Sequence, residues 1–260
     1  MTISRAIHQI WIPNWKDLPE KYKSRVQSVI EKNPGWTHYA WDNSNIPQLL
    51  NSIGPEYLAK YNSFSLIHQK VDFSRAAILY VHGGASVDAD AIAYKSFDTL
   101  PSIETSDFIA SYNSSNSLEN KVKAGIPVVL MNATILVKPR HPIVKSLLDY
   151  MMEQSCTVNE SDYSCIQHTT GPRAFTKYLL DNFKDQITIL DNSWLDPCNS
   201  SDTQCEIKPN TVLDQNQEGS WANPAYKTLQ KIYYTAKRHK NVLSVVGAFI
   251  LILIIVRIAK

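Results

Sequence analysis

The stretch that most constrains this chain runs from residue 68 to residue 94, HQKVDFSRAAILYVHGGASVDADAIAY. Apolar residues at helical spacing over residues 67–79 give way to Gly83-Gly84, then to a short β-like run and to Asp88-Ala-Asp90. This order predicts a helix that ends at the glycine pair and a strand that carries two carboxylates at its tip. A chain with this stretch is expected to fold as an α/β protein.

The two aspartates suggest a binding site for a metal ion and a diphosphate. On an extended strand, Asp88 and Asp90 would point to opposite faces, so both can serve one site only if the chain turns there. Hard oxygen ligands of this kind suit Mn²⁺ or Mg²⁺, which complete their coordination with phosphate oxygens and water. A solvated turn without function is the alternative, because chance Asp-x-Asp pairs are common.

A second pair of charged residues precedes the glycines. Asp72 and Arg75 are three residues apart on the predicted helix, so they share one face and can be aimed at the same place as Asp88 and Asp90. The alternative is an ordinary surface salt bridge, which contributes little to stability.

Together, Asp72-x-x-Arg75, Gly83-Gly84 and Asp88-x-Asp90 resemble the signature of glycosyltransferase family 32, the DXD sugar transferases. Members include initiating α-1,6-mannosyltransferases, mannosyl-inositol-phosphoceramide synthases and, more distantly, the clostridial glucosylating toxins. The resemblance covers roughly residues 5 to 221. It implies a GT-A-type fold, with a Rossmann-like mixed sheet and flanking helices, and sugar transfer with retention of configuration.

The resemblance implies roles for the four charged residues. Asp90 would hold the metal directly, and Asp88 would bind the ribose or the metal through water. Asp72 and Arg75 would orient the sugar hydroxyls, and all four count as candidate catalytic residues. The matching tryptophan of distant relatives stacks on the nucleotide base, so Trp11 is the candidate base platform, with a core tryptophan as the alternative.

Four further positions belong to the predicted donor site or its surroundings. Asn132 matches a family asparagine that could hydrogen-bond donor-sugar hydroxyls, or it bonds to backbone at a bulge. In the closing Gly-Ser-Trp, Ser220 would approach the metal and Trp221 the diphosphate. Thr170, in a Thr-Gly-Pro segment that lines the site in relatives, is equally well explained as a helix cap.

Two departures from the family pattern bear on activity. The histidine usually found shortly before Gly-Ser-Trp is absent, since residues 214–217 read Asp-Gln-Asn-Gln, and this puts metal affinity in doubt. The aromatic residue common two positions before the first motif aspartate is Ser86, which would loosen sugar positioning.

The remaining pattern supports an open sheet. Residues 7–12 and 36–41 are expected as strands around a helix over residues 19–32, and such a strand-helix-strand unit opens a parallel sheet with ligands beyond its carboxyl ends. Further strands are expected over residues 107–112, 128–137 and 187–190. Helices are expected within residues 46–61, from Pro142 to Met152, and from Pro172 onward.

Composition separates a catalytic domain from a membrane anchor. The net charge of +2, without Lys or Arg blocks, gives no reason to expect nucleic-acid binding, and residues 1–236 fit one catalytic domain. Residues 242–256, VLSVVGAFILILIIV, carry no charge and come just under the ~17 to 25 residues of a spanning helix. Basic residues before them favour a transmembrane anchor over residues 237–260, with a buried core helix as the alternative.

Features of the sequence disagree on which side of the membrane the catalytic domain of such a single-pass protein would lie. Basic residues before the anchor and the lack of an N-terminal signal favour a tail anchor with a cytosolic domain. The pairs Cys156/Cys165 and Cys198/Cys205 predict local disulfides, which favour a lumenal domain, and the resemblance implies the Golgi or ER lumen. Glycosylation sequons point the same way and begin at Asn113, Asn132, Asn159 and Asn199.

The sequence therefore predicts a membrane-anchored, metal-dependent hexosyltransferase. GDP-mannose is the expected donor, and a UDP-linked glucose, galactose or N-acetylglucosamine is the runner-up. A glycolipid or glycan at the membrane is the expected acceptor, with inositol phosphoceramide as the specific hypothesis. The competing hypotheses are a catalytically silent nucleotide-sugar-binding subunit, a need for a partner or regulatory subunit, and a structural membrane protein with chance motifs.

Overall fold

The computed structural model describes residues 2–113, 129–157, 160–198 and 205–215, together with residues 228 and 232. The described residues up to 215 belong to one compact unit. No helix among the described residues is both long and apolar enough to cross a bilayer. The predicted anchor over residues 237–260, together with Ser220 and Trp221, lies outside this part of the chain, so those assignments stay predictions.

The opening strand-helix-strand unit forms as expected. β1 (Ala6–Ile10), α1 (Glu20–Lys32) and β2 (Thr37–Trp41) follow one another, and β2 pairs with β1 in parallel. α1 ends at Asn33, where the Asn33 side-chain amide donates to the Val29 carbonyl at 2.8 Å. That bond satisfies one of the carbonyls left open at a helix end.

The central stretch adopts the predicted helix, turn and strand. α2 (Ile46–Ile53) and α3 (Pro55–Ser63) lead into α4 (Ile67–His82), the longest of the described helices. α4 ends at Gly83, which has φ 65°, and Gly84 follows with φ 84°. Both values lie in the left-handed region that favours glycine, so the pair reverses the chain at once into a strand.

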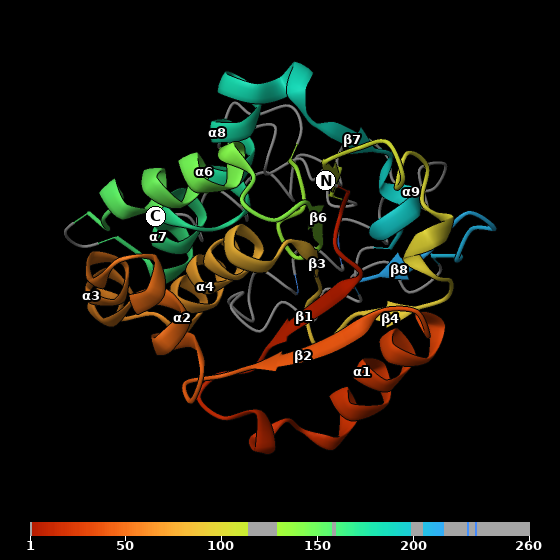
Figure 1. Ribbon diagram of the computed structural model, residues 1–260, viewed down its shortest axis with the longest axis horizontal. Helices are drawn as coiled ribbons and strands as arrows, with labels where there is room; N and C mark the ends of the chain where they lie inside the picture. Colours follow the sequence, from red (N-terminus) through yellow and green to blue (C-terminus); the bar gives the residue numbers. More distant parts are fainter. Residues whose placement is uncertain are drawn as a thin grey trace. The chain divides into compact units, whose positions relative to one another are not determined.

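The main sheet is mixed. Among the described residues its strand order is β2-β1-β3-β6-β5-β7 (Figure 1), with β3 at Gly84–Ser86, β5 at Phe108–Ser111, β6 at Ile135–Val137 and β7 at Thr188–Leu190. β1 runs parallel to β2 and to β3, β6 runs antiparallel to β3 and to β5, and β7 runs parallel to β5. The carboxyl ends of β1 and β3 therefore meet at one edge.

One predicted strand is shorter than expected. The strand expected over residues 128–137 is confined to Ile135–Val137, and Leu130 forms only an isolated bridge with Tyr112. Between them the chain bends at residues 132–134, where Asn132 turns its side chain to a partner outside the sheet. The apolar run was a poor guide to strand length because burial, not ladder pairing, explains its composition.

Helices cover one face of the sheet and a mixed layer covers the other (Figure 1). The first face packs against α2, α3, α4, α6 (Pro142–Glu153) and α8 (Pro172–Phe183), with α7 (Asp162–Thr169) beside α4 and α8. The second packs against α1, α9 (Asn192–Leu195) and the ladder of β4 (Ile92–Ala93) with β8 (Leu213–Asp214). Short 3₁₀ helices occupy Trp15–Asp17, Phe97–Thr99 and Lys184–Gln186.

Both predicted disulfides are confirmed. Cys156 bonds to Cys165 and thereby ties the segment after α6 to α7, and Cys198 bonds to Cys205. A bond between residues this close in sequence restricts the unfolded chain over a short loop.

Candidate active site

Three charged side chains form the centre of the site. Asp72 and Arg75 lie on one face of α4, where Arg75 Nη1 donates to Asp72 Oδ1 at 2.5 Å. Arg75 Nη2 also donates to Asp88 Oδ1, so one guanidinium joins the helix to the segment after β3. The Arg75 side chain is only 6% exposed, whereas that of Asp88 is 38% exposed. The predicted common face of Asp72 and Arg75 is therefore confirmed as a buried pair rather than a surface salt bridge.

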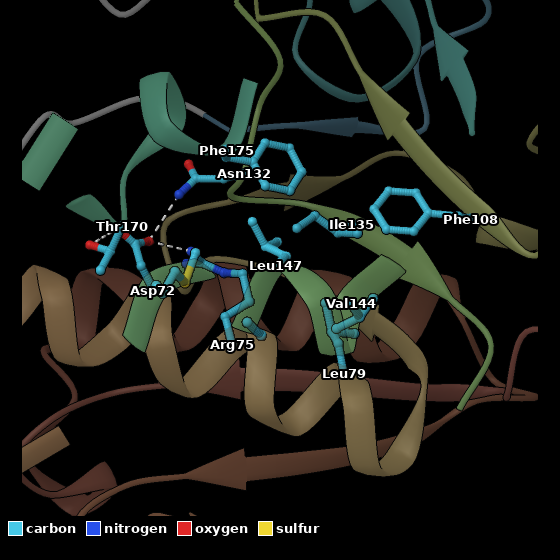
Figure 2. Close-up of a pocket in the computed structure, with 12 residues that line it drawn as sticks. Asp72, Arg75, Leu79, Phe108, Asn132, Ile135, Val144, Leu147, Thr170 and Phe175 are labelled. Carbon is cyan, nitrogen blue, oxygen red and sulfur yellow. Dashed lines mark hydrogen bonds and ion pairs between the residues drawn. The ribbon is translucent and has the colours of Figure 1, made fainter. Parts of the chain in front are cut away.

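Two neutral donors complete the surroundings of Asp72 (Figure 2). The Asn132 amide donates to Asp72 Oδ1 at 3.0 Å, and the Thr170 hydroxyl donates to Asp72 Oδ2 at 3.4 Å. Of the two interpretations left open for Thr170, the N-cap of α8 is wrong, because Gly171 holds that position before Pro172, whereas Thr170 ends α7. A hydroxyl beside a buried carboxylate has a stronger partner there than at a helix end.

Burial raises the pKa of Asp72 to about 6, although the positive charge of Arg75 lowers it and the negative charge of Asp88 raises it further. The pKa of Arg75 is raised above its usual value because the two carboxylates outweigh its burial. The guanidinium therefore stays charged at every physiological pH. A carboxylate with neutral donors on both oxygens and a cation behind it is well suited to accept hydroxyl groups of a sugar.

The glycine turn sets where Asp88 emerges. A Cβ on Gly84 would lie 2.4 Å from the Ala6 carbonyl oxygen, and a Cβ on Gly83 would lie 2.4 Å from the Pro139 nitrogen. Only glycine allows the chain to turn here with Pro139 and β1 this close. After β3 ends, the Val87 N–H donates to the β1 carbonyl at residue 8, and the aspartate pair follows in a turn. The predicted position of the pair, at a strand end with the chain turning, is confirmed.

Asp88 and Asp90 can offer hard oxygen ligands to a divalent ion. The Asp90 main-chain carbonyl accepts from Arg25 Nη1 at 3.4 Å, which attaches the turn to α1. Within the described ranges, no three His, Cys, Asp or Glu side chains gather as a metal site. A carboxylate pair whose coordination is completed by phosphate oxygens and water is how Mg²⁺ and Mn²⁺ are commonly held, so these residues fit such an ion.

Trp11 lies beside the same turn. It follows β1 directly, packs in a cluster with Ala89, and its ring meets Tyr22 at a centroid distance of 5.2 Å. It is half-buried, so part of its ring remains accessible. The structure therefore brings Trp11 next to Asp88 and Asp90, while its role as a base platform stays a prediction.

The two departures from the family pattern have defined places. Ser86 is buried in β3 opposite Ile135 of β6. Asp214, in the segment that lacks the histidine, is buried in β8 opposite Ile92, two residues after Asp90. The neighbourhood of the aspartate pair therefore includes this segment.

His8 is a residue of the site region whose role the sequence did not reveal. Its Nδ1 accepts from the Trp41 indole at 3.0 Å, and its Nε2 lies 3.0 Å from the Gly83 carbonyl, to which it donates. Burial is the main cause that lowers the pKa of His8 to about 4, so the ring is neutral and holds the glycine turn. A histidine within an apolar strand was the available signal.

Behind the charged centre lies a small cavity of about 10 Å³, room for one water molecule. Asp72, Arg75, Asn132 and Thr170 form its polar end (Figure 2). Its other wall is apolar and consists of Ala76, Leu79, Phe108, Ile135, Val144, Leu147, Met151 and Phe175. The polar end is thus backed by a packed wall that limits its movement.

Comparisons with known proteins agree with this geometry. Residues 19–107 match the family described as glycosyltransferase sugar-binding region containing DXD motif. An uncharacterized glycosyltransferase of Acanthamoeba polyphaga mimivirus is 30% identical over 245 residues, which cover 90% of this chain and 89% of the relative. Inositol phosphoceramide mannosyltransferase 3 of Schizosaccharomyces pombe is 29% identical over 98 residues, 38% of this chain and 27% of that protein.

A solved structure shares the fold. The UDP-bound glycosyltransferase domain from the YGT toxin superposes with a TM-score of 0.53 at 10% identity, over 96% of this chain and 88% of that one. The mixed α/β architecture with flanking helices is thus a GT-A-like glycosyltransferase fold.

Proposed function

The chain belongs to glycosyltransferase family 32, the DXD-containing sugar transferases, and from that premise we propose that it is a retaining, metal-dependent mannosyltransferase. The donor is GDP-mannose and the acceptor is a membrane-associated glycolipid or glycan. The observation that carries the proposal is the buried network in which Arg75 joins Asp72 on α4 to Asp88 beside the DXD turn. A nucleotide sugar needs both halves, one for its sugar and one for its diphosphate.

Asp90 would hold Mn²⁺ or Mg²⁺ directly, Asp88 would contact it directly or through water, and Ser220 would be a further ligand. When bound, the ion would neutralise the charge that develops on the leaving nucleoside diphosphate. Trp221 would approach that diphosphate and Trp11 would stack on the base. Ser220 and Trp221 enter this proposal from the family pattern alone.

The chain's own residues orient the sugar. Among the described residues, Asp72 Oδ2 accepts only the long bond from Thr170, so it is the oxygen that would accept a sugar hydroxyl. Arg75 keeps Asp72 and Asp88 in fixed positions, and Asn132 offers an amide beside them. Groups held this rigidly place the anomeric carbon against the acceptor with little motional freedom left.

The proposed step exchanges one bond at the anomeric carbon. The bond to the diphosphate oxygen breaks, and the bond to the acceptor oxygen forms on the same face, which retains configuration. The acceptor hydroxyl gives its proton to the departing diphosphate oxygen. No protein nucleophile is required, in keeping with a site whose central carboxylate is occupied by Arg75 and Asn132.

One relative supports the proposed acceptor, and the predicted anchor supports the proposed compartment. The fission-yeast relative is named for mannosyl transfer to inositol phosphoceramide, which makes that lipid the specific acceptor proposed here. A protein anchored by residues 237–260 would act at a Golgi or ER membrane with its catalytic domain in the lumen. A cytosolic-facing tail anchor is the alternative arrangement, and a partner subunit fits either one.

Two alternatives have their own observations. The UDP-bound toxin domain shares the fold, which supports a UDP-linked glucose, galactose or N-acetylglucosamine as the alternative donor. The missing histidine and Ser86 favour a catalytically silent subunit that binds a nucleotide sugar.

The test is turnover by the full chain in detergent, with GDP- and UDP-sugars and with or without Mn²⁺. We expect Mn²⁺-dependent hydrolysis or transfer of GDP-mannose, lost in Asp90→Ala and kept in Asp181→Ala, an exposed aspartate of α8 that pairs with Lys177. Turnover of a UDP-sugar and not of GDP-mannose would show that the donor is the UDP-sugar. Nucleotide binding without turnover of any donor would favour the silent subunit.

A further inference from the structure

A fully buried glutamine lies near the carboxyl end of β1. Gln9 is 0% exposed, and its neighbours in the strand, His8 and Ile10, are buried too. An apolar residue would be placed there at a lower desolvation cost, because a buried amide must find partners for its N–H groups and its oxygen. The partners of Gln9 therefore indicate why an amide occupies this position.

Gln9 contacts the DXD segment on one side. Its Nε2 donates to the main-chain carbonyl of Asp88 at 3.2 Å. This bond comes directly after the last main-chain bond between the two strands, from Val87 to His8. The Asp88 peptide is thus held by Gln9 while the Asp88 carboxylate is held by Arg75. Two fixed points on one residue determine where its other carboxylate oxygen points.

His38 fixes the orientation of Gln9 on the other side. Ile7 is the β1 partner of His38, and side chains alternate along strands, so His38 and Gln9 share a face of the sheet. His38 Nε2 lies 2.9 Å from Gln9 Oε1. A carbonyl such as that of Asp88 can only accept, so the Gln9 amide must face it, and its oxygen must face His38. Nε2 of His38 therefore carries the proton.

We propose that Gln9 and His38 are positioning residues for the nucleotide-sugar donor, because they orient Asp88 from its main chain. The inference rests on the proposed function, since it assigns the two residues to the donor site. Neither residue touches the donor in this scheme. Both act through the Asp88 peptide, so their loss weakens donor and nucleoside diphosphate binding more than it slows the chemical step.

The test compares two substitutions of His38, which is half-buried and therefore tolerant of exchange. His38→Phe keeps a planar ring but removes the donor to Gln9, whereas His38→Gln keeps an amide N–H near the position of Nε2. Calorimetry on the full chain in detergent measures Mn²⁺-dependent GDP and UDP binding, steady-state kinetics give KM and kcat, and thermal unfolding reports stability. Gln9→Met, uncharged and similar in size, is the second variant.

We expect His38→Phe to weaken nucleoside diphosphate binding and to raise the donor KM about 3- to 10-fold, the effect of one lost hydrogen bond. kcat should stay within about 2-fold, and His38→Gln should restore binding to within about 2-fold of wild type. Gln9→Met should match His38→Phe; if it does not fold, the His38 pair still decides.

Unchanged binding in His38→Phe, or equal loss in His38→Phe and His38→Gln, would overturn the proposal. These outcomes are read against an active or nucleotide-binding wild type. A wild type that neither binds a nucleoside diphosphate nor turns over a donor would instead refute the proposed function. The two failures therefore remain distinguishable.

Discussion

The two sides of the site are held in different ways. On the β3 side, the main chain of Asp88 is placed by backbone geometry: the turn at Gly83 and Gly84, and buried partners on β1. On the α4 side, Asp72 is placed by side-chain bonds, chiefly from Arg75. The first side depends on space and the second on charge. Substitutions that add an atom should damage the first side, and substitutions that remove a charge should damage the second.

The largest effect is expected on the backbone-held side. Gly84→Ala combines a left-handed φ of 84° with a Cβ 2.4 Å from the Ala6 carbonyl oxygen. Strain and overpacking together should lower the free energy of unfolding by about 5 kcal/mol. Gly35→Ala is the matched control, since its Cβ would meet only the Arg5 side chain at 3.5 Å. Chemical denaturation measures the free energy of unfolding of both variants. Small losses of equal size in the two variants would contradict the prediction.

The charge-held side should respond to loss of its cation. Arg75→Met leaves buried Asp72 without its counter-ion, and breaking such a pair costs about 3 to 5 kcal/mol of unfolding free energy. Adding Asp72→Asn removes the unpaired charge, so the double variant should regain at least about half of that loss. Denaturant unfolding of the single and double variants measures this coupling. A double variant no more stable than Arg75→Met would show that packing, not charge, is at stake.

The free energy of unfolding should depend on pH through the ionisation of Asp72, on the charge-held side. Its pKa is about 6 in the folded protein and 3.8 when unperturbed, so the folded state retains a proton that the unfolded chain releases. The resulting stability is fully present below about pH 4 and is lost as the pH rises through about 6, a change of up to about 3 kcal/mol. Unfolding curves from pH 4 to 7 should show wild type losing stability relative to Asp72→Asn; parallel curves would refute this.

The smallest effect is expected from removing a disulfide, and the two disulfides should differ in their influence on the donor KM. Gln69 Nε2 lies 3.4 Å from Cys165 Sγ and donates to Thr169 Oγ1 at 2.9 Å, next to the threonine that contacts Asp72. Replacing Cys156 and Cys165 by serine should cost about 2 kcal/mol and raise the donor KM about 2- to 5-fold.

The other cysteine pair is the control for this last prediction. The Cys198–Cys205 bond closes a loop of similar length, so replacing both of its cysteines by serine should cause a similar loss of stability. The donor KM should not change, because no described bond links that pair to Asp72 within the part of the chain that the structure covers. A KM shift in both variants, or in neither, would contradict the assigned difference.

The sequence predicted the charged half of the site but not its supports. Asp72, Arg75, Asp88 and the glycines carry local signals, namely helical spacing and residues that end elements, and each lies where expected. Gln9 acts across strands, and the partner of a buried amide depends on which strand lies beside it. The sequence left Thr170 open between two interpretations because a threonine before Gly-Pro looks the same whether it caps a helix or reaches a distant carboxylate.

The spacing of the contacts along the chain has a consequence for folding. Arg75 and Asp88 are separated by 13 residues, whereas Asn132 and Thr170 reach Asp72 over 60 and 98 residues. Closing the longer loops costs more chain entropy and makes those contacts late ones. The segment that matches the family, residues 19–107, contains all the charges and neither neutral donor. During synthesis, all the residues of the ion-pair network are therefore present before either neutral donor to Asp72 has been added to the chain.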